Sequence, residues 1–485
     1  MRVVHVASEV APFAQSGGLA DVVAGLPAAQ AESHGLGAAV VVPLYRGVAA
    51  ALAARSIALA PGEAFSTKIG STTFSGALRV ARVGHVTYGF VDAPALYDRP
   101  GTLYGPGGAG EFSDNHIRFA VLSKVAVDYG HTLVGGPPDV LHVHDWQAAL
   151  AAVYARIANA SCAVVATIHN LAYRGIFAKA TMDELGLPWS WFDIHRLEFY
   201  DQVCLLKGGL AAADAVTTVS PTYAREILTP ERGEALDGFL RWDVRRLVGI
   251  VNGIDVKEWD PATDRALPER FSATAMEGKL ACRAALAKEL GLALADDQPL
   301  IGVIARMTGQ KGIDLVAEIV PELQRLGAKL VVLGSGEPAI EDRFRYLATA
   351  FAEHVAVRIG FDLALSRRIY AGCDLFAMPS RFEPCGLGQL YAMRYGTIPI
   401  VTAVGGLRDT VSDVSVGAAP SSISGTGIRF DTPTVLPFLH AIERAIALVR
   451  DVPQCAAVRR AAMARDSSWT ASALQYVKLY RSLRS

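Results

Sequence analysis

The chain has 485 residues, of which 51% are hydrophobic and 19% are charged, so it is neither a disordered protein nor short enough for a single core. Its formal net charge is -1 and its basic residues form no block, which excludes the usual signature of a nucleic-acid partner. No apolar stretch reaches the ~18–20 residues of a membrane span, and no signal peptide is recognisable. The six cysteines form no C-x-x-C pair, which argues against zinc or a disulfide framework and favours reduced thiols in a cytoplasm.

The first half of the chain alternates between apolar runs and amphipathic segments, which indicates strands that alternate with helices. Strands are expected at residues 3–7, 38–43, 139–143, 163–168, 215–219 and 248–251. Helices are expected at residues 19–33, 114–129, 148–158 and 206–213. Residues 79–92 alternate as a hairpin does, and the Gly- and Pro-rich residues 97–111 are interpreted as a mobile loop over a cleft.

A second series of the same kind follows. Its strands are expected at residues 300–305, 330–333, 355–359, 374–378, 398–401 and 427–430, and its helices at 312–326, 365–372 and 387–395. An amphipathic helix at 469–483 ends the chain, and the turn signal Asn252-Gly253 is interpreted as a hinge. The predicted fold class is therefore α/β, with two doubly wound, Rossmann-like domains at residues 1–247 and 253–465.

Glu383 stands in the turn Ser-Arg-Phe-Glu-Pro-Cys-Gly-Leu (380–387), between a buried strand and the start of a helix. Ligands bind at the carboxyl ends of strands in open α/β sheets, and a helix N-terminus favours an anion. A buried acid in such a place indicates function. The alternative is that Glu383 is only a helix-capping acid.

Arg306 and Lys311 lie at the end of one strand and just before a helix. Two cations five residues apart in such a place predict a diphosphate clamp, because arginine binds two oxygens at once and lysine adds a compact charge. Gly405-Gly406 is a second pair of glycines at the start of a helix, and it follows a later strand. Solvated surface cations and an ordinary turn remain the alternatives for these two features.

Polar residues also end strands of the first half. Gly17 and Gly18 open its first helix and let a diphosphate or sugar approach the backbone, although a plain tight turn has the same pattern. Asp145-Trp146 and His169-Asn170 follow two central strands. A lone histidine there is more often structural, but the adjacent Asn170 adds the fixed donors and acceptors that a sugar needs.

These motifs together resemble those of the bacterial glycogen synthases and plant starch synthases, from Met1 to the final helix. The segments that carry the resemblance are 16–23 (Ser-Gly-Gly-Leu-Ala-Asp-Val-Val), 144–146 (His-Asp-Trp), 169–173 (His-Asn-Leu-Ala-Tyr), 251–255 (Val-Asn-Gly-Ile-Asp), 306–312 (Arg-Met-Thr-Gly-Gln-Lys-Gly) and 380–387. The resemblance implies a GT-B fold, in which two domains face a central cleft and the last helix, residues 466–485, completes the first. It implies transfer of glucose from ADP-glucose to the non-reducing end of an α-1,4-glucan, with retention of configuration and without a metal or other cofactor.

The resemblance also implies roles for single residues. Arg306 and Lys311 would neutralise the diphosphate as the glycosidic bond breaks, and Glu383 would hold the glucose ring and steady the charge that develops on it. His169 and Asn252 would hold the transferred glucose. The other expected donor-binding residues are Gln15, Gly17, Gly18, Asp21, Asn170 and the backbone of Cys385, Gly386 and Leu387, and the expected acceptor-side residues are Tyr97, Asp145 and Trp146.

Gln15 departs from the family pattern, which has lysine two residues before the first glycine. A neutral amide replaces a fixed charge, and the loss of one charge-assisted contact is expected to weaken donor or transition-state binding by ~1.5–3 kcal/mol. Two alternatives therefore remain beside an ADP-glucose-dependent synthase. One is a GT-B glucosyltransferase with another nucleotide-glucose donor, and the other is an inactive glucan-binding paralogue.

Overall fold

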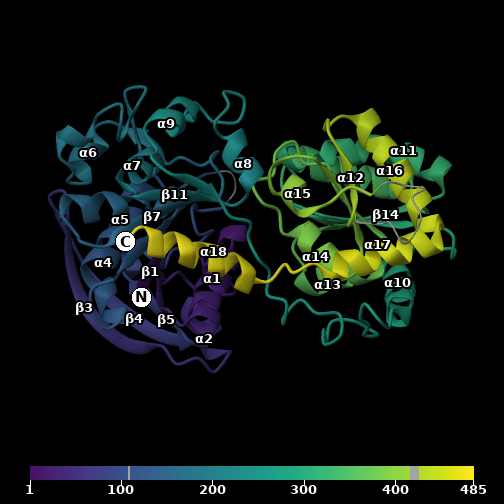
Figure 1. Cartoon of the computed structure of the whole chain (residues 1–485), viewed down its shortest axis with the longest axis horizontal. Coiled ribbons are helices and arrows are strands. Elements are labelled where there is room, and N and C mark those ends of the chain that lie inside the picture. Colours follow the sequence, from purple (N-terminus) through teal and green to yellow (C-terminus); the bar gives the residue numbers. More distant parts are fainter. Residues whose placement is uncertain (108–109, 415–424, 485) are drawn as a thin grey trace. The chain divides into compact units, whose positions relative to one another are not determined.

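The computed structural model describes residues 1–107, 110–414 and 425–484. It contains two compact units, the first formed by Met1–Gly253 with Ser468–Ser485 and the second by Ile254–Ser467 (Figure 1). None of the helices in the described part of the chain is long and apolar enough to cross a membrane.

The first unit is built on a nine-stranded sheet in the order β12-β11-β7-β6-β1-β2-β5-β4-β3. All neighbouring strands from β12 to β5 are parallel, whereas β5, β4 and β3 are antiparallel. The hairpin expected at residues 79–92 is present as β4–β5, and β3 extends it. The strands are β1 (Arg2–Val6), β2 (Gly37–Pro43), β3 (Ala60–Ile69), β4 (Thr72–Val83), β5 (Val86–Asp92), β6 (Val140–His144), β7 (Ala163–Ile168), β11 (Ala215–Thr218) and β12 (Leu247–Gly249).

Helices cover this sheet on both faces. On one face, α5 (Asp145–Ile157) packs against both α4 (Asn115–Leu133) and α7 (Leu205–Ala212), and all three pack against the strands. On the other, α1 (Gly18–His34) and the final helix α18 (Trp469–Ser482) lie side by side over a core that includes Val3, Val140 and Val165 (Figure 1). A Cβ at Gly25 of α1 would lie 2.0 Å from the Trp469 indole nitrogen, so only glycine permits this close approach.

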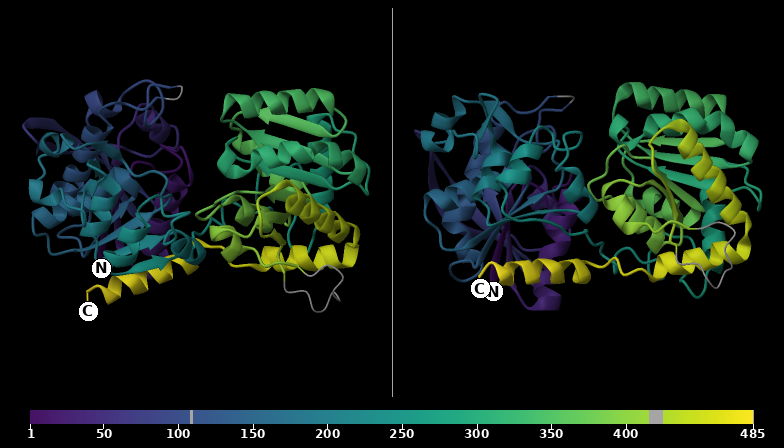
Figure 2. Two further views of the ribbon diagram at one scale, coloured as in Figure 1. Left: turned by 90° about the horizontal axis from the view of Figure 1, so that it is seen from above. Right: turned by 45° about the horizontal axis from the view of Figure 1, so that its top comes forward.

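The two ends of the chain belong to this same unit and lie near one another in every view (Figures 1 and 2). Asp139 contacts both end segments, because its carboxylate accepts a hydrogen bond from the Arg2 amide at 2.7 Å and pairs with Arg484 at 3.0 Å. The unit also has a small antiparallel sheet, β8 (Ile176–Ala178), β10 (Gln202–Cys204) and β9 (Glu198–Phe199). Its remaining helices are α2 (Val48–Ala53), α3 (Pro94–Tyr97), α6 (Thr181–Glu184), η1 (Trp189–Trp191), α8 (Pro221–Glu226) and α9 (Asp237–Trp242).

The second unit has a six-stranded sheet in the order β15-β14-β13-β16-β17-β18, and every pair of neighbours is parallel. Taken in chain order this is 3-2-1-4-5-6, the doubly wound order of dinucleotide-binding domains. The strands are β13 (Leu300–Ile304), β14 (Lys329–Gly334), β15 (Val355–Ile359), β16 (Leu375–Met378), β17 (Ile398–Thr402) and β18 (Ile428–Phe430). The helices are α10 (Glu277–Leu290), η2 (Gly309–Lys311), α11 (Ile313–Leu326), α12 (Pro338–Ala350), α13 (Leu363–Gly372), α14 (Gly388–Arg394), α15 (Gly405–Thr410), α16 (Val435–Arg450) and α17 (Val452–Ala464).

Local signals explain where several of these helices begin and end. The Asp362 side chain accepts a hydrogen bond from the Leu365 amide at 2.8 Å and so caps α13. Gly327, in the left-handed region at φ 66°, ends α11, whose apolar side faces the sheet. The expected alternation of strands and helices in both halves is confirmed.

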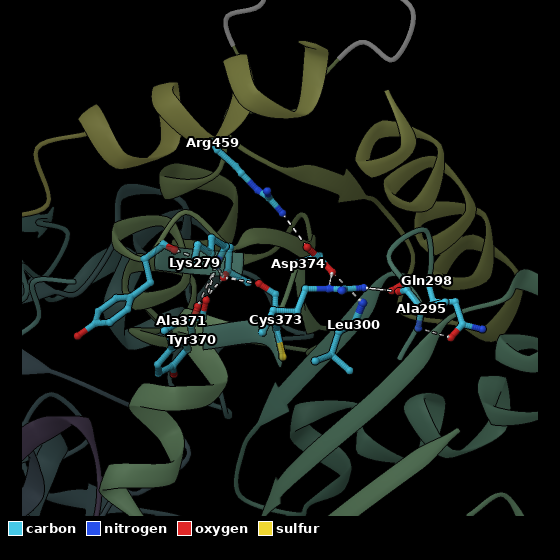
Figure 3. A network of polar contacts seen from close by, with 12 residues as sticks. Lys279, Ala295, Gln298, Leu300, Tyr370, Ala371, Cys373, Asp374 and Arg459 are labelled. Carbon is cyan, nitrogen blue, oxygen red and sulfur yellow. Dashed lines mark hydrogen bonds and ion pairs between the residues drawn. The ribbon is translucent and has the colours of Figure 1, made fainter. Parts of the chain in front are cut away.

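A buried polar network fixes the start of β16 (Figure 3). Asp374 accepts hydrogen bonds from the Leu300 amide at 3.0 Å, from Arg283 at 3.2 Å and from Arg459 at 2.8 Å. Nearby, the buried Lys279 ammonium donates to the carbonyls of Ala371 at 2.8 Å and Tyr395 at 3.0 Å and to Thr397 Oγ1 at 2.7 Å. The strand that leads to the Glu383 turn is therefore held by charged groups at its start.

Candidate active site

In the second unit, the switch point of the sheet lies between β13 and β16, because the strand order reverses there. The loop that follows β13 contains Arg306 and Lys311, and the turn that follows β16 contains Glu383. The topology therefore places both sequence motifs at the position where ligands bind in doubly wound sheets.

Lys311 and Glu383 form a direct ion pair at this point. The Lys311 Nζ and Glu383 Oε2 atoms are 2.5 Å apart, and Ser380 Oγ donates a second hydrogen bond to the same oxygen at 3.1 Å. The side chain of Glu383 is 6% exposed and that of Lys311 is 24% exposed. The carboxylate is therefore nearly buried, whereas the ammonium is partly exposed and within reach of a ligand.

Backbone geometry brings the two loops into contact. Gly312 has φ 64°, and a Cβ on it would lie 2.0 Å from the carbonyl oxygen of Pro379 at the end of β16. Arg381 donates to both carboxylate oxygens of Asp314, at 2.7 and 2.6 Å, and to the carbonyl of Gly309 at 2.6 Å. The hydrogen bonds from Arg381 hold the pKa of Asp314 below its usual value. These contacts hold the loop that carries Arg306 and Lys311 against the Glu383 turn.

The glycine pair at 405–406 serves the same turn. Gly405 has φ 42°, and a Cβ on it would lie 1.9 Å from the Glu383 carbonyl oxygen, which accepts a hydrogen bond from the Gly406 amide at 3.1 Å. Within the described part of the chain, the backbone amides of Gly386 and Leu387 donate no hydrogen bond. Those two N–H groups are therefore available to an oxygen of a ligand, while Cys385 is buried beside them.

Arg306 lies on the same loop as Lys311 and is exposed to solvent. The structure therefore joins Lys311 to Glu383 directly and places Arg306 on the loop that carries Lys311.

In the first unit, the corresponding switch point lies between β1 and β6. Glu9, three residues after β1, was missed by the reasoning from sequence. Its buried carboxylate accepts hydrogen bonds from the Ser16 amide at 2.7 Å, Ser16 Oγ at 2.5 Å, the Gly17 amide at 3.2 Å and the Tyr104 hydroxyl at 2.5 Å. Glu9 thereby connects the start of α1 with the segment that contains Tyr104. An acid shortly after the first strand was the only signal in the sequence.

The residues around the first glycine pair lie together. Gln15 Nε2 donates to Asp21 Oδ2 at 3.2 Å, Gly17 is the N-cap of α1, and Gly18 begins the helix. The neutral Gln15 therefore contacts an acid at the point where the family pattern has a lysine.

Asp145 and His169 directly follow the adjacent strands β6 and β7 and are joined by a hydrogen bond from the His169 amide to Asp145 Oδ1 at 2.7 Å. Asp145 has φ 56°, an uncommon value for a residue with a side chain, and burial raises its pKa to about 7. Burial lowers the pKa of His169 to about 3, so its ring is neutral near pH 7. Asn170 follows and accepts a hydrogen bond from the Ala172 amide at 3.1 Å.

Three further expected site residues are buried. Tyr97 is 1% exposed and its hydroxyl donates to the Arg118 carbonyl at 2.6 Å, and Trp146 is 5% exposed and packs against Phe119. The expectation that Tyr97 lies in an open loop on the acceptor side is not met, because Tyr97 ends α3 and buries its ring in the core. Asn252 is also buried, and in the described structure its Oδ1 atom has no hydrogen-bond partner.

His5, His142 and His144 are residues of a type that can bind a metal, and one potential ligand atom from each lies within 4.8 Å of the others. All six of their ring nitrogens already have hydrogen-bond partners, in each other, His169, Gln30, Tyr480 and Thr167. Their lone pairs and protons are therefore engaged with protein groups, and the cluster is arranged as a hydrogen-bond network.

Comparisons with known proteins identify the family of the chain. Residues 2–242 match the family described as "Starch synthase catalytic domain", and residues 298–426 match "Glycosyl transferases group 1". The glycogen synthase of Anaeromyxobacter dehalogenans (strain 2CP-C) is 46% identical over 489 residues, covering 100% of both chains. That of Yersinia pseudotuberculosis serotype IB (strain PB1/+) is 42% identical over 492 residues, again covering 100% of both. The chain belongs to the glycogen synthase family.

Solved structures place this glycogen synthase family member among the GT-B glycosyltransferases. The catalytic domain of starch synthase IV from Arabidopsis thaliana, bound to ADP and acarbose, has a TM-score of 0.88 at 34% identity, covering 100% of this chain and 99% of that one. Sucrose-phosphate synthase from Thermosynechococcus elongatus has a TM-score of 0.60 at 19% identity, covering 100% and 99%, a likeness of fold alone. The expected family, GT-B fold and retaining glycosyltransferase class are confirmed.

Proposed function

We propose that this glycogen synthase family member transfers glucose from ADP-glucose to the 4-hydroxyl at the non-reducing end of an α-1,4-glucan, with retention of configuration. The observation that carries the proposal is the Lys311–Glu383 pair at the switch point of the second unit. It joins a cation suited to a phosphate with an acid suited to a sugar. The solved starch synthase IV relative, which was bound to ADP and acarbose, supports a nucleotide and a glucan-like ligand for this site.

In this proposal, Arg306 and Lys311 neutralise the diphosphate as the bond to the sugar breaks. Their charges are fixed before the reaction begins, so they stabilise the leaving group without reorganisation. Glu383 holds the glucose ring and steadies the positive charge that develops on it. The amides of Gly386 and Leu387 bind oxygens of the donor.

The first unit supplies neutral hydrogen-bonding groups in the same proposal. His169, Asn170 and Asn252 hold the transferred glucose, and Asp21 orders the segment that contains Gln15, Gly17 and Gly18. Asp145 positions His169 through the hydrogen bond to its amide. Because Tyr97 and Trp146 are buried, they support the acceptor side through packing.

The reaction is proposed to need no metal, since protein cations take the role that a divalent ion has in other transferases. The test is elongation of maltodextrin from ADP-glucose by the purified protein in EDTA, followed by the release of ADP. Full activity in EDTA is expected. A strict requirement for an added divalent ion would contradict the proposal.

A second candidate function is a GT-B glucosyltransferase with another nucleotide donor, and the observation that favours it is the neutral Gln15 beside Asp21. Competition among ADP-, UDP- and GDP-glucose separates the two candidates, and preference for ADP-glucose is expected. Glucan binding without any release of nucleotide would instead indicate a catalytically inactive paralogue.

A further inference from the structure

One face of the sheet in the first unit is polar at the carboxyl ends of its strands. Each strand alternates, so residues two apart share a face. Val3 and His5 on β1, Val140, His142 and His144 on β6, and Val165 and Thr167 on β7 follow this rule, and the strand register pairs His5 with His142 and His144 with Thr167. The apolar members pack against α1 and α18, and the polar members continue the same face toward the site.

The polar side chains form one continuous chain of hydrogen bonds, here called the histidine chain. It runs from His169 Nε2 to His144 Nδ1 (3.0 Å), from His144 Nε2 to His5 Nδ1 (3.1 Å) and from His5 Nε2 to Gln30 Oε1 (2.8 Å). Gln30 Nε2 then contacts the Tyr480 hydroxyl (3.1 Å), which contacts His142 Nδ1 (2.7 Å), and His142 Nε2 contacts Thr167 Oγ1 (2.5 Å). All members are fully buried except His169, which is partly buried.

The rings of this chain are neutral. Burial lowers the pKa of His5 to about 4 and that of His169 to about 3, and it lowers the pKa values of His142 and His144 well below 6.5. A neutral imidazole has one nitrogen that donates and one that accepts. Once the position of the proton at one end of the histidine chain is known, the positions of the other ring protons follow.

Gln30 sets that end. Its Oε1 atom can only accept, so His5 must donate from Nε2 and accept at Nδ1. His144 must then donate from Nε2 and accept at Nδ1, which requires His169 to donate from Nε2. In this orientation the Nε2 atom of Gln30 donates to the Tyr480 hydroxyl on α18.

We propose that Gln30 and Tyr480 are positioning residues that hold His169 as the Nε2–H tautomer, so that its Nδ1 atom is an acceptor for a hydroxyl of the bound sugar. In the described structure, the Nδ1 atom of His169 has no hydrogen-bond partner within the protein. The role toward a sugar rests on the proposed function, whereas the tautomer itself does not. The final helix α18 thereby determines the state of a side chain at the site.

With the Gln30 amide reversed, the chain of hydrogen bonds would be equally continuous, so the two amide orientations can be told apart only by the proton positions on the histidines. If the Gln30 amide were reversed, His5 and His144 would each donate from Nδ1 and His169 would also carry its proton on Nδ1. The site would then present a donor where the observed orientation presents an acceptor. The position of a single proton on His169 therefore decides between the two orientations of the Gln30 amide.

Nitrogen-15 NMR of the imidazoles in the full-length protein without ligand measures that proton. A spectrum of His169→Asn assigns the His169 signals. The expected result at pH 7.5 is a single Nε2–H tautomer for His169. A proton on Nδ1 would overturn the proposal, whether or not the protein transfers glucose.

Two variants test the origin of the tautomer. Tyr480→Phe removes the acceptor of the Gln30 amide, and Gln30→Met removes the amide itself, so both are expected to show a mixture of tautomers at His169. The matched control is Tyr476→Phe, which removes a hydroxyl that is outside the histidine chain but is buried on the same helix. The control is expected to keep the single Nε2–H form.

Kinetics of the same variants test the consequence. The value of kcat/KM for ADP-glucose is expected to fall about two- to tenfold in Tyr480→Phe, the effect of one neutral hydrogen bond, and to stay unchanged in Tyr476→Phe. Equal losses in the two tyrosine variants, or a wild-type value in Tyr480→Phe, would overturn the positioning role. If the wild-type protein transferred no glucose, the NMR result would still confirm or overturn the tautomer.

Discussion

Replacement of Lys311 by methionine tests the central pair of the site. Methionine keeps most of the apolar length of lysine but removes the ammonium that lies 2.5 Å from Glu383 Oε2. If Lys311 stabilises the departing diphosphate, its loss resembles removal of one preorganised group that stabilises charge in a transition state. Such losses lower kcat by about 10²–10³, or about 3–4 kcal/mol, and we expect a decrease of that size.

The same substitution is expected to have a smaller effect on the free energy of unfolding, and the contacts of Glu383 indicate the size of that effect. Glu383 keeps the hydrogen bond from Ser380 at 3.1 Å but loses a charge-assisted one. A hydrogen bond to a charged group contributes about 1.5–3 kcal/mol, and the 24% exposure of Lys311 places the expected loss toward the lower value. In the double variant Lys311→Met/Glu383→Gln, a neutral amide no longer needs a cation, so stability is expected to recover while activity is not.

The measurements are initial rates of ADP release over a range of ADP-glucose concentrations, and unfolding by urea. Arg306→Met is the companion variant, because Arg306 is an exposed cation of the same loop. It is expected to lower activity without a measurable loss of stability. A kcat within about threefold of the wild type for Lys311→Met, or recovered activity in the double variant, would refute the role given to Lys311, since the mechanism expects about 10²-fold.

Three more substitutions have expected outcomes. Gln15→Lys restores the charge of the family pattern and should lower KM for ADP-glucose about tenfold or more, the effect of one charge-assisted contact, and an unchanged KM would place residue 15 away from the donor. Asp145→Asn should flatten the pH dependence of unfolding. With its pKa raised to about 7, the folded protein keeps this proton where the unfolded chain has released it, so stability falls from about pH 4 to about pH 7 by up to about 1.4 kcal/mol per pH unit. An identical slope in urea titrations of the variant would contradict this. Lys279→Met leaves buried oxygens without their donor and should lower the free energy of unfolding by about 2–5 kcal/mol. Lys288→Met, an exposed change on the same helix, should not lower it. Equal effects of the two variants would show that the burial of Lys279 is unimportant.

The sequence predicted the two doubly wound series, and it singled out the motifs that are proposed to bind the substrates, because both are local features. Apolar runs of strand length separated by amphipathic segments indicate β and α elements without knowledge of their partners. Glycines such as Gly312 and Gly405 mark points where two backbones meet, and the structure shows each within 2.0 Å of a carbonyl oxygen once a Cβ is added. What the glycines could not reveal is which backbone they meet, since that depends on strand order.

Burial and side-chain pairing were predicted less well. Tyr97 lies in a Gly- and Pro-rich segment and was expected at the surface, yet its ring is in the core beside Tyr45. Glu9 has no motif of its own, because its four donors come from a helix start and from Tyr104, which is 95 residues away. Each of these depends on contacts between distant segments, which a single sequence does not encode as a pattern.

The histidine chain shows why strand register carries functional information. A shift of one residue in the pairing of β1 with β6 would turn His5 to the opposite face from His142 and His144 and break the path to His169. The same shift would turn Val3 away from α18, so the packing of apolar residues at one end of these strands enforces the hydrogen bonds at the other. In the second unit the site instead depends on opposite charges, Lys311 and Glu383, at the ends of neighbouring strands. The two units therefore use one topological position for two kinds of chemistry, neutral groups with fixed protons in the first and fixed charges in the second, which are the requirements of a sugar and of a diphosphate respectively.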